Sequence, residues 1–427
     1  MGEYKLRIAD ALLEEKLEGM GAVLVEGPKW CGKTTTSEQH AQSILYLDDP
    51  KNRQQNLQLA DVNPEMLLQG DVPRLIDEWQ LAPTLWDAVR FVVDHRNEEG
   101  QFILTGSAVP LNVEDKTQIS HTGTGRIARL RMRTMSLWES GESNGSVSLQ
   151  QLINDSDHIA GINPLSIDDI AFLVCRGGWP RATFQTRKIA LGRAFDYYDA
   201  VVNQDLQRID DVLRSTERVK LLMRSYARLQ GTQTSLCAIC DDMKSHDDNT
   251  LDDRTVAAYI HALKKIFVIE DMPAWNPNLR SKTAIRTSDT RYFSDSSIAV
   301  AALGLCPADL INDLHTFGLL FETMCVRDLR VYADALGGTV YHYRDKDGLE
   351  CDAVLHFRNG TYMLVEIKLG GDKLVEEGAT SLLKLAQKID TDKMKSPLCL
   401  IVLTGTGNYA YKRKDGVCII PIGCLKN

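Results

Sequence analysis

The most specific chemical pattern in the sequence is a glycine-bounded loop with the spacing G-x-x-x-x-G-K-[ST], which is typical of phosphate-binding loops. It comprises Gly27, Pro28, Lys29, Trp30, Cys31, Gly32, Lys33 and Thr34, and Thr35 follows it. The glycines let backbone N–H groups turn toward phosphate oxygens at the start of a helix, whose N-terminal dipole favours anions. Lys33 is expected to reach the β- and γ-phosphates of ATP, and Thr34 to ligate Mg²⁺. The alternative is a glycine turn that carries a surface lysine.

Two strand ends farther along the sequence could complete this chemistry. The apolar segment 74–76 runs into Asp77 and Glu78, about 45 residues after the loop. Asp77 would hold Mg²⁺ directly or through water, and Glu78 would orient and deprotonate the attacking water. The next expected strand ends near Thr105 and Ser107, either of which could touch the γ-phosphate or the water. The alternative there is a strand that ends in a Thr-Gly turn.

A basic strand follows this region. Residues 126–133 contain four arginines and no acid, and Arg129, Arg131 and Arg133 alternate onto one strand face. Such a row could supply an arginine finger to a neighbouring subunit or contact DNA phosphates. The alternative is a solvated basic edge strand, which also resists aggregation.

A second group of charged residues lies near the C-terminus. Asp352 falls on one expected strand, Glu366 and Lys368 share a face of the next because they are two residues apart, and Glu322 lies on the preceding helix. Three carboxylates and a lysine could converge on one or two Mg²⁺ ions and cleave a phosphodiester, with Lys368 orienting the water or stabilising charge. The alternative is an alternating strand whose Glu and Lys face solvent.

Residues 234–265 have the pattern of a helix-turn-helix. Ser235 could cap the first helix, and Asp252 or Asp253 the second. The second helix has an expected buried stripe and an expected groove-facing set, which are Val256, Tyr259, Ile260 and Leu263, and Arg254, Thr255, Ala258 and His261, respectively. An expected strand at 266–269 then completes a winged helix. Acids at 241–242 and 247–248 oppose DNA binding, so both DNA contact and protein interaction stay open.

These residues must be positioned by several domains. Alternating strand and helix patterns over 21–140 predict an α/β domain with a parallel P-loop NTPase sheet. A Ser-, Gly- and Asn-rich stretch at 140–165 is the best candidate for a linker or a long loop, and mainly helical sequence follows. From residue 315 the order is helix, three strands, helix and two strands, which favours an α/β, restriction-endonuclease-like domain. The expected domains are 1–140 (ATPase), 141–230 (linker and helices), 231–312 (winged helix) and 313–427 (nuclease-like).

Composition sets the outer limits. The 427 residues include 49 Lys and Arg against 58 Asp and Glu, and the net charge of −9 argues against a bulk nucleic-acid binder while allowing a local basic patch. No apolar run approaches the roughly 20 residues of a membrane span. The ten cysteines are scattered as in reduced cytosolic proteins, and the close pair Cys237 and Cys240 lacks the further ligands of a zinc site. A cytoplasmic protein without a membrane partner is expected.

Together these motifs resemble the predicted bacterial and archaeal ATPases of the AAA+ superfamily whose C-terminal half is a domain of unknown function. The matching segments, which span nearly the whole chain, are GPKWCGKT, RLIDEWQ, FILTGSA, GRIARLRMRTMSLWES, GGWPRA, YYDAVVNQDLQRID, RYFSDSSIAV, FGLLFETMCVRDLR, YHYRDKDGLECDAVL and LVEIKLG. The resemblance implies ATP binding and hydrolysis at Lys33, Thr34, Asp77 and Glu78. It also implies Ser107 or Thr105 as a sensor and Arg126 as a phosphate-sensing arginine. The Asp352, Glu366 and Lys368 pattern is similar to the PD-(D/E)XK nuclease superfamily.

Three functions are therefore considered. The first is a Mg²⁺-dependent ATPase that couples nucleotide state to its winged-helix and nuclease-like half. The second is an ATP-regulated, metal-dependent DNA or RNA nuclease in genome defence or mobile-element control. The third is an ATP-switched binding or assembly module without cleavage. The expected partners are ATP, DNA at the two C-terminal modules, and a further copy or another protein.

Overall fold

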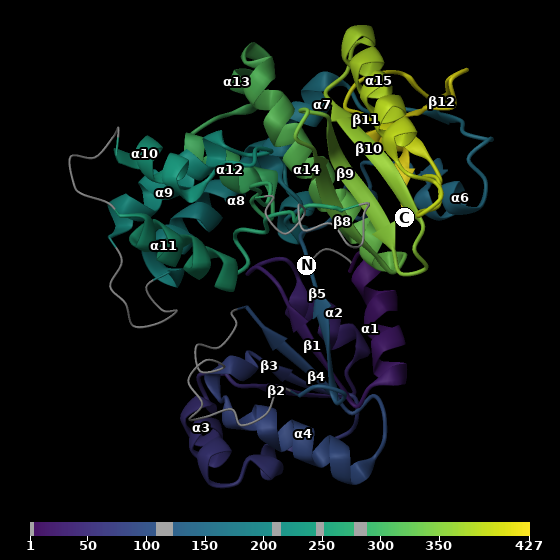
Figure 1. Cartoon of the computed structure of the whole chain (residues 1–427). Coiled ribbons are helices and arrows are strands. Elements are labelled where there is room, and N and C mark those ends of the chain that lie inside the picture. Colours follow the sequence, from purple (N-terminus) through teal and green to yellow (C-terminus); the bar gives the residue numbers. More distant parts are fainter. Residues whose placement is uncertain (1–3, 108–122, 207–214, 245–251, 277–287) are drawn as a thin grey trace.

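The computed structural model describes residues 4–107, 123–206, 215–244, 252–276 and 288–427. In Figure 1 the N-terminal sheet and its helices form the lower part of the molecule. The middle helices lie above them on one side, and a second sheet with α15 lies above them on the other.

The N-terminal part is a five-stranded parallel sheet between helices, which confirms the predicted α/β architecture. The strand order is β2-β3-β4-β1-β5. The strands are β1 (Ala22–Glu26), β2 (Ser43–Tyr46), β3 (Arg74–Asp77), β4 (Phe102–Gly106) and β5 (Ile127–Arg131). The helices are α1 (Ile8–Gly19), α2 (Lys33–His40), α3 (Arg53–Val62) and α4 (Thr84–Arg96). Strand β4 is the central strand, and β1 lies between it and the edge strand β5, so the C-terminal end of β1 has a parallel strand end on each side.

Strand β1 is apolar along most of its length because both faces of the sheet are covered there. Ala22 and Leu24 pack into the cluster that contains α4 side chains, whereas Val23 and Val25 pack into the cluster with Leu13 of α1. A parallel strand that is covered on both sides reads as a continuous hydrophobic segment.

Beside a smaller cluster that includes Leu364 and Leu382, the rest of the chain shares one large hydrophobic cluster that runs from Leu137 to Leu425. Its middle helices are α5 (Leu137–Ser140), α6 (Leu149–Asn154), α7 (Ile167–Arg176), α8 (Arg187–Ala200), α9 (Thr216–Arg228), α10 (Leu236–Lys244), α11 (Asp253–Lys265), α12 (Ser296–Leu303) and α13 (Pro307–Asn312), with the short turns η4 (Pro180–Phe184) and η5 (Val201–Asp205). The middle helices and the second sheet are therefore packed together.

The second sheet has the order β7-β12-β13-β11-β10-β9-β8. Strands β8 (Gly338–Arg344), β9 (Glu350–Phe357) and β10 (Tyr362–Lys368) pair antiparallel, and β11 (Leu400–Thr404) pairs parallel to β10. Helices α14 (Leu314–Ala335) and α15 (Asp372–Lys388) precede β8 and follow β10. The predicted order of helix, three strands, helix and strand is confirmed, and β12 (Tyr409–Lys412) is an additional strand before β13 (Cys418–Pro421).

The stretch expected to be a linker is instead part of the C-terminal half. Strand β6 (Val147–Ser148) pairs with β14 (Leu425–Lys426), and β7 (Gly161–Ile162) pairs with β12. Ser143 Oγ also donates to the Leu425 carbonyl at 2.6 Å. Of the two alternatives for this stretch, the linker is wrong, because unpaired backbone groups of strand edges are satisfied by a segment far away in sequence.

The helix-turn-helix candidate is formed by α10 and α11, which pack with α9. The expected stripe of α11 is buried, its Arg254, Ala258 and His261 are exposed, and the side chain of Asp252 caps the helix by accepting from Thr255 N at 2.7 Å. The strand expected at 266–269 is reduced to isolated antiparallel bridges, such as the one between Ile269 and Phe293, because Phe267 adopts a positive φ of 62°. Residues 247–248 lie outside the described residues.

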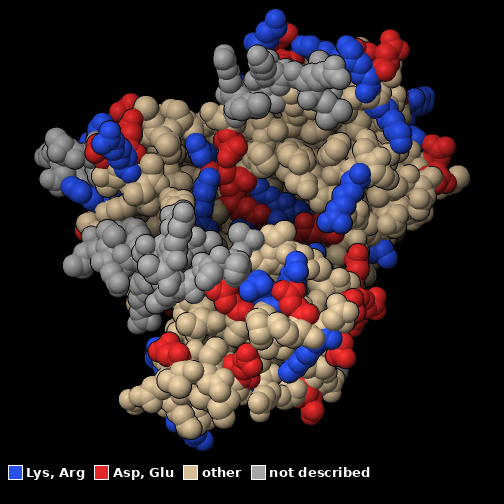
Figure 2. All heavy atoms as spheres, turned by 60° about the horizontal axis from the view of Figure 1, so that its bottom comes forward, with Lys and Arg blue, Asp and Glu red and all other residues tan. Residues whose placement is uncertain are grey.

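The surface in Figure 2 carries acidic and basic side chains interspersed, and it is hollowed near its middle. All ten cysteines are free thiols. Among the described residues, no helix is both long and apolar enough to cross a membrane.

Candidate functional site

The glycine-rich loop follows β1 directly, and α2 begins at its Lys33. Three of its residues have positive φ, at 155° for Gly27, 65° for Trp30 and 102° for Gly32. A Cβ on Gly27 would lie 2.0 Å from the carbonyl oxygen of Met132, so this position requires glycine. The loop therefore has the curled backbone that the spacing predicts.

Lys33 is folded back into the loop. Its ammonium donates to the carbonyl oxygens of Gly27 at 2.9 Å and Pro28 at 2.8 Å, and the residue is only 6% exposed. The cation is thus held at the helix N-terminus, where phosphate oxygens bind in loops of this kind.

Thr34 and Asp77 come together at the carboxyl ends of β1 and β3. Thr34 donates its hydroxyl to Asp77 Oδ1 at 2.8 Å, and Thr105 at the end of β4 donates to the same oxygen. Burial raises the pKa of Asp77, and the two threonine hydroxyls oppose that rise. A hydroxyl and a carboxylate, completed by phosphate oxygens, are the donor set that Mg²⁺ uses in phosphoryl-transfer sites. Thr34 and Asp77 therefore fit the predicted metal ligands in chemistry and position.

Glu78 lies beside this pair in a left-handed backbone conformation, with φ 56° and ψ 45°. Its carboxylate accepts from the Gln80 amide and, at 3.4 Å, from the Ser107 hydroxyl. Burial raises the pKa of Glu78, while the Gln80 hydrogen bond and the positive charge of Lys33 counteract the shift. A carboxylate that titrates closer to neutrality is better suited to take a proton from water.

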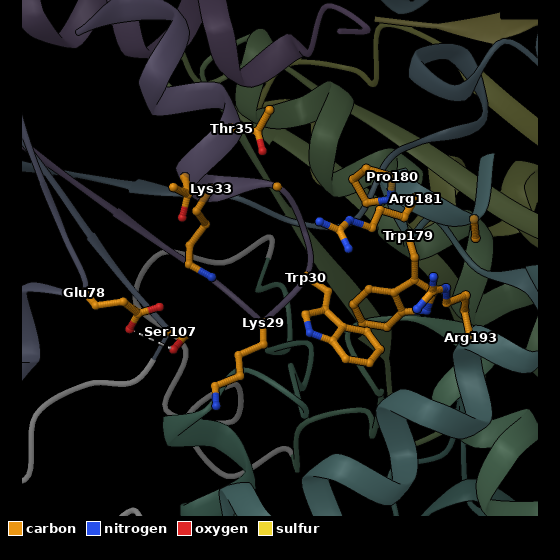
Figure 3. Close-up of a pocket in the computed structure, with 13 residues that line it drawn as sticks. Lys29, Trp30, Lys33, Thr35, Glu78, Ser107, Trp179, Pro180, Arg181 and Arg193 are labelled. Carbon is orange, nitrogen blue, oxygen red and sulfur yellow. Dashed lines mark hydrogen bonds between the residues drawn. The ribbon is translucent and has the colours of Figure 1, made fainter. Parts of the chain in front are cut away.

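A cavity of about 470 Å³ opens in front of the loop. One wall carries Lys33, Glu78 and Ser107, and the opposite wall comes from η4 and α8, with Arg181 and Arg193 (Figure 3). Arg193 donates to the Gln185 side chain at 3.2 Å, and Arg181 forms no ion pair with an acid in the described part of the chain.

Arg181 and Arg193 were not predicted as site residues. The segment GGWPRA, which contains Arg181, carries no phosphate-binding spacing, and more than 140 residues separate it from the loop. Only the packing of the middle helices against the first sheet brings these cations to the cavity.

Arg126 contradicts its expected role. It directly precedes β5, and its carbonyl accepts from Ala22 N at 3.1 Å, so it lies at the amino end of the sheet. Its guanidinium pairs with Asp94 at 2.5 Å. The loop lies at the carboxyl end of β1, so the phosphate-sensing prediction for Arg126 is wrong.

Arg129 and Arg131 of β5, and Arg133 two residues beyond the end of the strand, form ion pairs within the chain. Arg129 pairs with Glu26 at 2.9 Å, and Arg133 pairs with Glu270 at 2.7 Å and with Asp334 at 2.5 Å. Arg131 lies 3.8 Å from Glu270 as well. Arg131 and Arg133 therefore tie the first sheet to the C-terminal half. Strand β5 is the edge of its sheet, as the alternative reading expects, and Arg129 there is half exposed and pairs with the neighbouring strand β1.

The second group of predicted residues also converges. Lys368 Nζ lies 2.6 Å from Glu366 Oε2 and 3.1 Å from Asp352 Oδ2, and Asp352 also accepts from Ile367 N at 2.7 Å. Glu322 accepts from the Tyr292 hydroxyl. Between the pairs Tyr341–Val354 and Tyr343–Cys351, β9 has one residue more than β8, and this bulge contains Asp352.

Burial and mutual repulsion dominate this acidic cluster of Glu322, Asp352 and Glu366. Burial, and next the charge of Asp352, raise the pKa values of Glu322 and Glu366. Burial alone would lower the pKa of Lys368, but the carboxylates of Asp352 and Glu366 raise it above its ordinary value. No three His, Cys, Asp or Glu side chains among the described residues are arranged as a metal site. In this cluster the Lys368 ammonium lies between the carboxylates instead.

Comparisons with known proteins divide the chain into three parts. Residues 20–140 match the model of an AAA domain, 167–309 match a domain of unknown function (DUF8612), and 317–425 match another (DUF4143). Uncharacterised proteins of Mycobacterium bovis and Mycobacterium tuberculosis are each 21% identical over 97% of this chain and 83% of their own length.

Solved structures give weaker likenesses. The Walker-type ATPase PABY2304 of Pyrococcus abyssi is 14% identical, with a TM-score of 0.44 over 69% of this chain and 94% of its own. The ORC2 protein of Aeropyrum pernix, in ADPNP-ADP complexes, is 10% identical, with a TM-score of 0.21 over 77% of this chain and 96% of its own. With scores below 0.5, these likenesses carry no argument of their own. The family match and the geometry of the loop together establish that residues 20–140 form an AAA-type P-loop domain.

Proposed function

We propose that the protein binds Mg²⁺–ATP in the cavity between the P-loop and the middle helices, and hydrolyses it there. The observation that supports this most directly is the convergence of Lys33, Thr34, Asp77 and Glu78 at the carboxyl ends of β1 and β3, the two parallel strands that flank β4. Ligands of open α/β sheets bind at this edge.

Each of these residues has a role in phosphate cleavage. The metal, held by Thr34 and Asp77, would supply charge neutralisation on the phosphates. Lys33 exchanges its two carbonyl partners for phosphate oxygens. Glu78, positioned by Gln80 and Ser107, accepts the proton of the attacking water. Thr105 fixes Asp77, so the two sensor candidates serve different carboxylates.

The opposite wall of the cavity couples this chemistry to the rest of the chain. Arg181 and Arg193 present two cations to the cavity from η4 and α8. A nucleotide that contacts both walls would be bound more tightly when the middle helices are closed on the P-loop, which makes the domain arrangement depend on the nucleotide. The unit of α9–α11, proposed as a winged helix that binds DNA or protein, and a further copy or protein partner are natural recipients of that change.

Lys33→Ala is expected to weaken binding of a non-hydrolysable ATP analogue at least about 100-fold, because a charged group that contacts phosphate in a partly buried site is lost. Calorimetric titration of the full chain measures the affinity directly. Lys51→Ala removes an exposed lysine outside the cavity and serves as the matched control. Equal affinity in the wild type and Lys33→Ala would rule out the proposed site.

A second candidate function, metal-dependent cleavage of DNA or RNA, is favoured by the acidic cluster and Lys368. The carboxylates have the oxygen donors that Mg²⁺ or Mn²⁺ prefers, and a divalent cation there would stabilise charge on a phosphodiester. Lys368, which now bridges Asp352 and Glu366, would turn its ammonium toward the scissile phosphate.

Cleavage at this cluster should increase as the pH rises from about 6 to about 9, because the raised pKa values of Glu322 and Glu366 keep them protonated in the lower part of that range. Linear, circular and single-stranded DNA and RNA with Mn²⁺ are the substrates to test. Asp352→Asn should abolish cleavage, and Glu350→Gln, an exposed acid on the same strand, should retain it. Cleavage that persists in Asp352→Asn comes from elsewhere.

A further inference from the structure

Lys29, the third residue of the P-loop, reaches across the cavity edge to the middle helices. Its ammonium lies 2.5 Å from Asp205 Oδ1, at the end of η5. The Asp205 side chain is 10% exposed, whereas that of Lys29 is 43% exposed. Among the described residues, the ionic partner of this nearly buried carboxylate is therefore a cation of the phosphate-binding loop.

The same lysine belongs to the reaction side of the cavity. It lines that space together with Lys33, Glu78 and Ser107. After burial and the Gln80 hydrogen bond, the charges of Lys33 and Lys29 both act on Glu78. The Lys29 ammonium is thus close enough to influence the group that would take the proton of water.

The reach of Lys29 is fixed by a neighbouring aromatic contact. Trp30, the next residue of the loop, packs edge-on against Tyr197 of α8 at 5.6 Å between ring centroids. Tyr197 in turn packs on Trp179 at 4.3 Å. These contacts hold the loop against α8, and Lys29, which both pairs with Asp205 and lines the cavity, lies between the two.

We propose that Lys29 is a catalytic residue whose ammonium pairs with Asp205 before the nucleotide binds. When ATP binds, this ammonium moves to the γ-phosphoryl oxygens. This inference rests on the proposed ATP hydrolysis. The triphosphate carries several negative charges and competes effectively with the single charge of one carboxylate.

In the reaction, the oxygen of water forms a bond to the γ-phosphorus, and the bond to the β,γ-bridging oxygen breaks with its electron pair leaving on ADP. The water proton moves to Glu78. Lys29 donates hydrogen bonds to the charged phosphoryl oxygens and transfers no proton, so its effect is electrostatic. Asp205 meanwhile loses the ionic partner that it has among the described residues, and removing the cation from a buried ion pair is unfavourable. The end of η5 must then rearrange, which connects the occupied site to the middle helices.

Two variants that break the same ion pair separate this role from a structural one. Lys29→Met should reduce ATP turnover on the order of 100-fold, as expected for loss of one transition-state donor, and should prevent tight binding of ADP with aluminium fluoride. Its affinity for ADP alone should stay within about threefold of the wild type, since Lys33 and the loop backbone are intact. Asp205→Asn releases Lys29 and should keep or increase both turnover and aluminium-fluoride binding. Lys29→Arg should retain most of the turnover.

A structural ion pair would make Lys29→Met and Asp205→Asn equally defective, and that result would overturn the inference. Wild-type turnover in Lys29→Met would overturn it as well, while leaving the proposed ATPase intact. A wild-type chain that neither binds nor hydrolyses ATP would exclude both proposals. Thermal unfolding of each full-length variant identifies any loss that arises from misfolding.

Discussion

The Glu78→Gln variant is expected to bind ATP as tightly as the wild-type chain and to hydrolyse it at least about 100-fold more slowly, the effect of removing a general base. Glutamine keeps the size of the side chain and can still bond to Ser107, but it cannot accept the proton of water. Lys33 and Thr34, which are proposed to contact the nucleotide, are held by the Gly27 carbonyl and by Asp77, and not by this carboxylate. Phosphate release under steady-state conditions and calorimetric affinity for ATP measure the two quantities separately.

The pH dependence of the wild type adds an independent check. Burial raises the pKa of Glu78, and the base must be ionised to act, so turnover should rise with pH through that raised value. Glu98→Gln, a change at an exposed acid on the same domain, should leave both turnover and its pH profile unchanged. If the turnover of Glu78→Gln stays within about twofold of the wild type, another group acts as the general base.

The first sheet and its P-loop could be predicted because their signals are local. The loop spacing fixes Gly27 and Lys33 beside each other, and the two acids follow an apolar strand that ends at the same sheet edge. The sequence offers Ser107 and Thr105 as alternatives, and both lie at the site, where Ser107 bonds to Glu78 and Thr105 to Asp77. A residue at the end of a parallel strand needs only the strand direction to be placed.

The rule that ligands bind at the carboxyl ends of parallel strands places Asp77 at the site and excludes Arg126 from it. Arg126 precedes its strand, and the amino end of a parallel strand lies at the opposite edge from the ligand. The family resemblance implies a phosphate-sensing role for Arg126, but the direction of the strand places this residue at the other edge of the sheet.

The second wall of the cavity and the bulge could not be predicted from local signals. Arg181 and Arg193 reach the cavity through packing of the middle helices on the first sheet. The spacing of Glu366 and Lys368 correctly placed both on one face. Asp352 lies in a bulge of β9, and an extra residue changes the alternation on which such arguments depend. Long-range strand pairing likewise incorporates the 140–165 stretch into the C-terminal half, although its composition is typical of a linker.

Arg327→Met is expected to lower the stability of the fold by about 3–5 kcal/mol, the effect of removing one partner from a buried ion pair. Arg327 lies 2.7 Å from Asp328 and 3.1 Å from Asp295, and all three side chains are at most 2% exposed. Methionine fills much of the same volume but leaves two buried carboxylates without their cation. Urea or thermal unfolding, compared with the exposed control Arg358→Met, measures the effect.

The pH dependence of this loss has a defined sign. Burial acts to raise the pKa of Asp295, but the Arg327 guanidinium outweighs it and holds the pKa below its usual value. Burial raises the pKa of Asp328 to about 6 even with that cation present. Without Arg327, both folded-state pKa values rise above their unfolded values, so the folded variant binds protons more readily and loses stability as pH rises. The destabilisation should be larger at about pH 8 than at about pH 6, and a pH-independent difference would contradict this origin.

Arg327→Met should also change the cavity that is proposed to bind the nucleotide, although the residues that line it lie on other elements. Asp295 accepts from Thr134 Oγ1 at 2.6 Å, just beyond β5, and from Gly178 N at 2.9 Å, next to Trp179 in the second wall. When Asp295 loses the positive charge of Arg327, the hydrogen bonds through which it joins the first sheet, the middle helices and α14 are all weakened. ATP affinity in Arg327→Met should therefore fall at a temperature where the chain is still folded, although every P-loop residue is retained. An unchanged affinity there would mean that the second wall is positioned without this buried network.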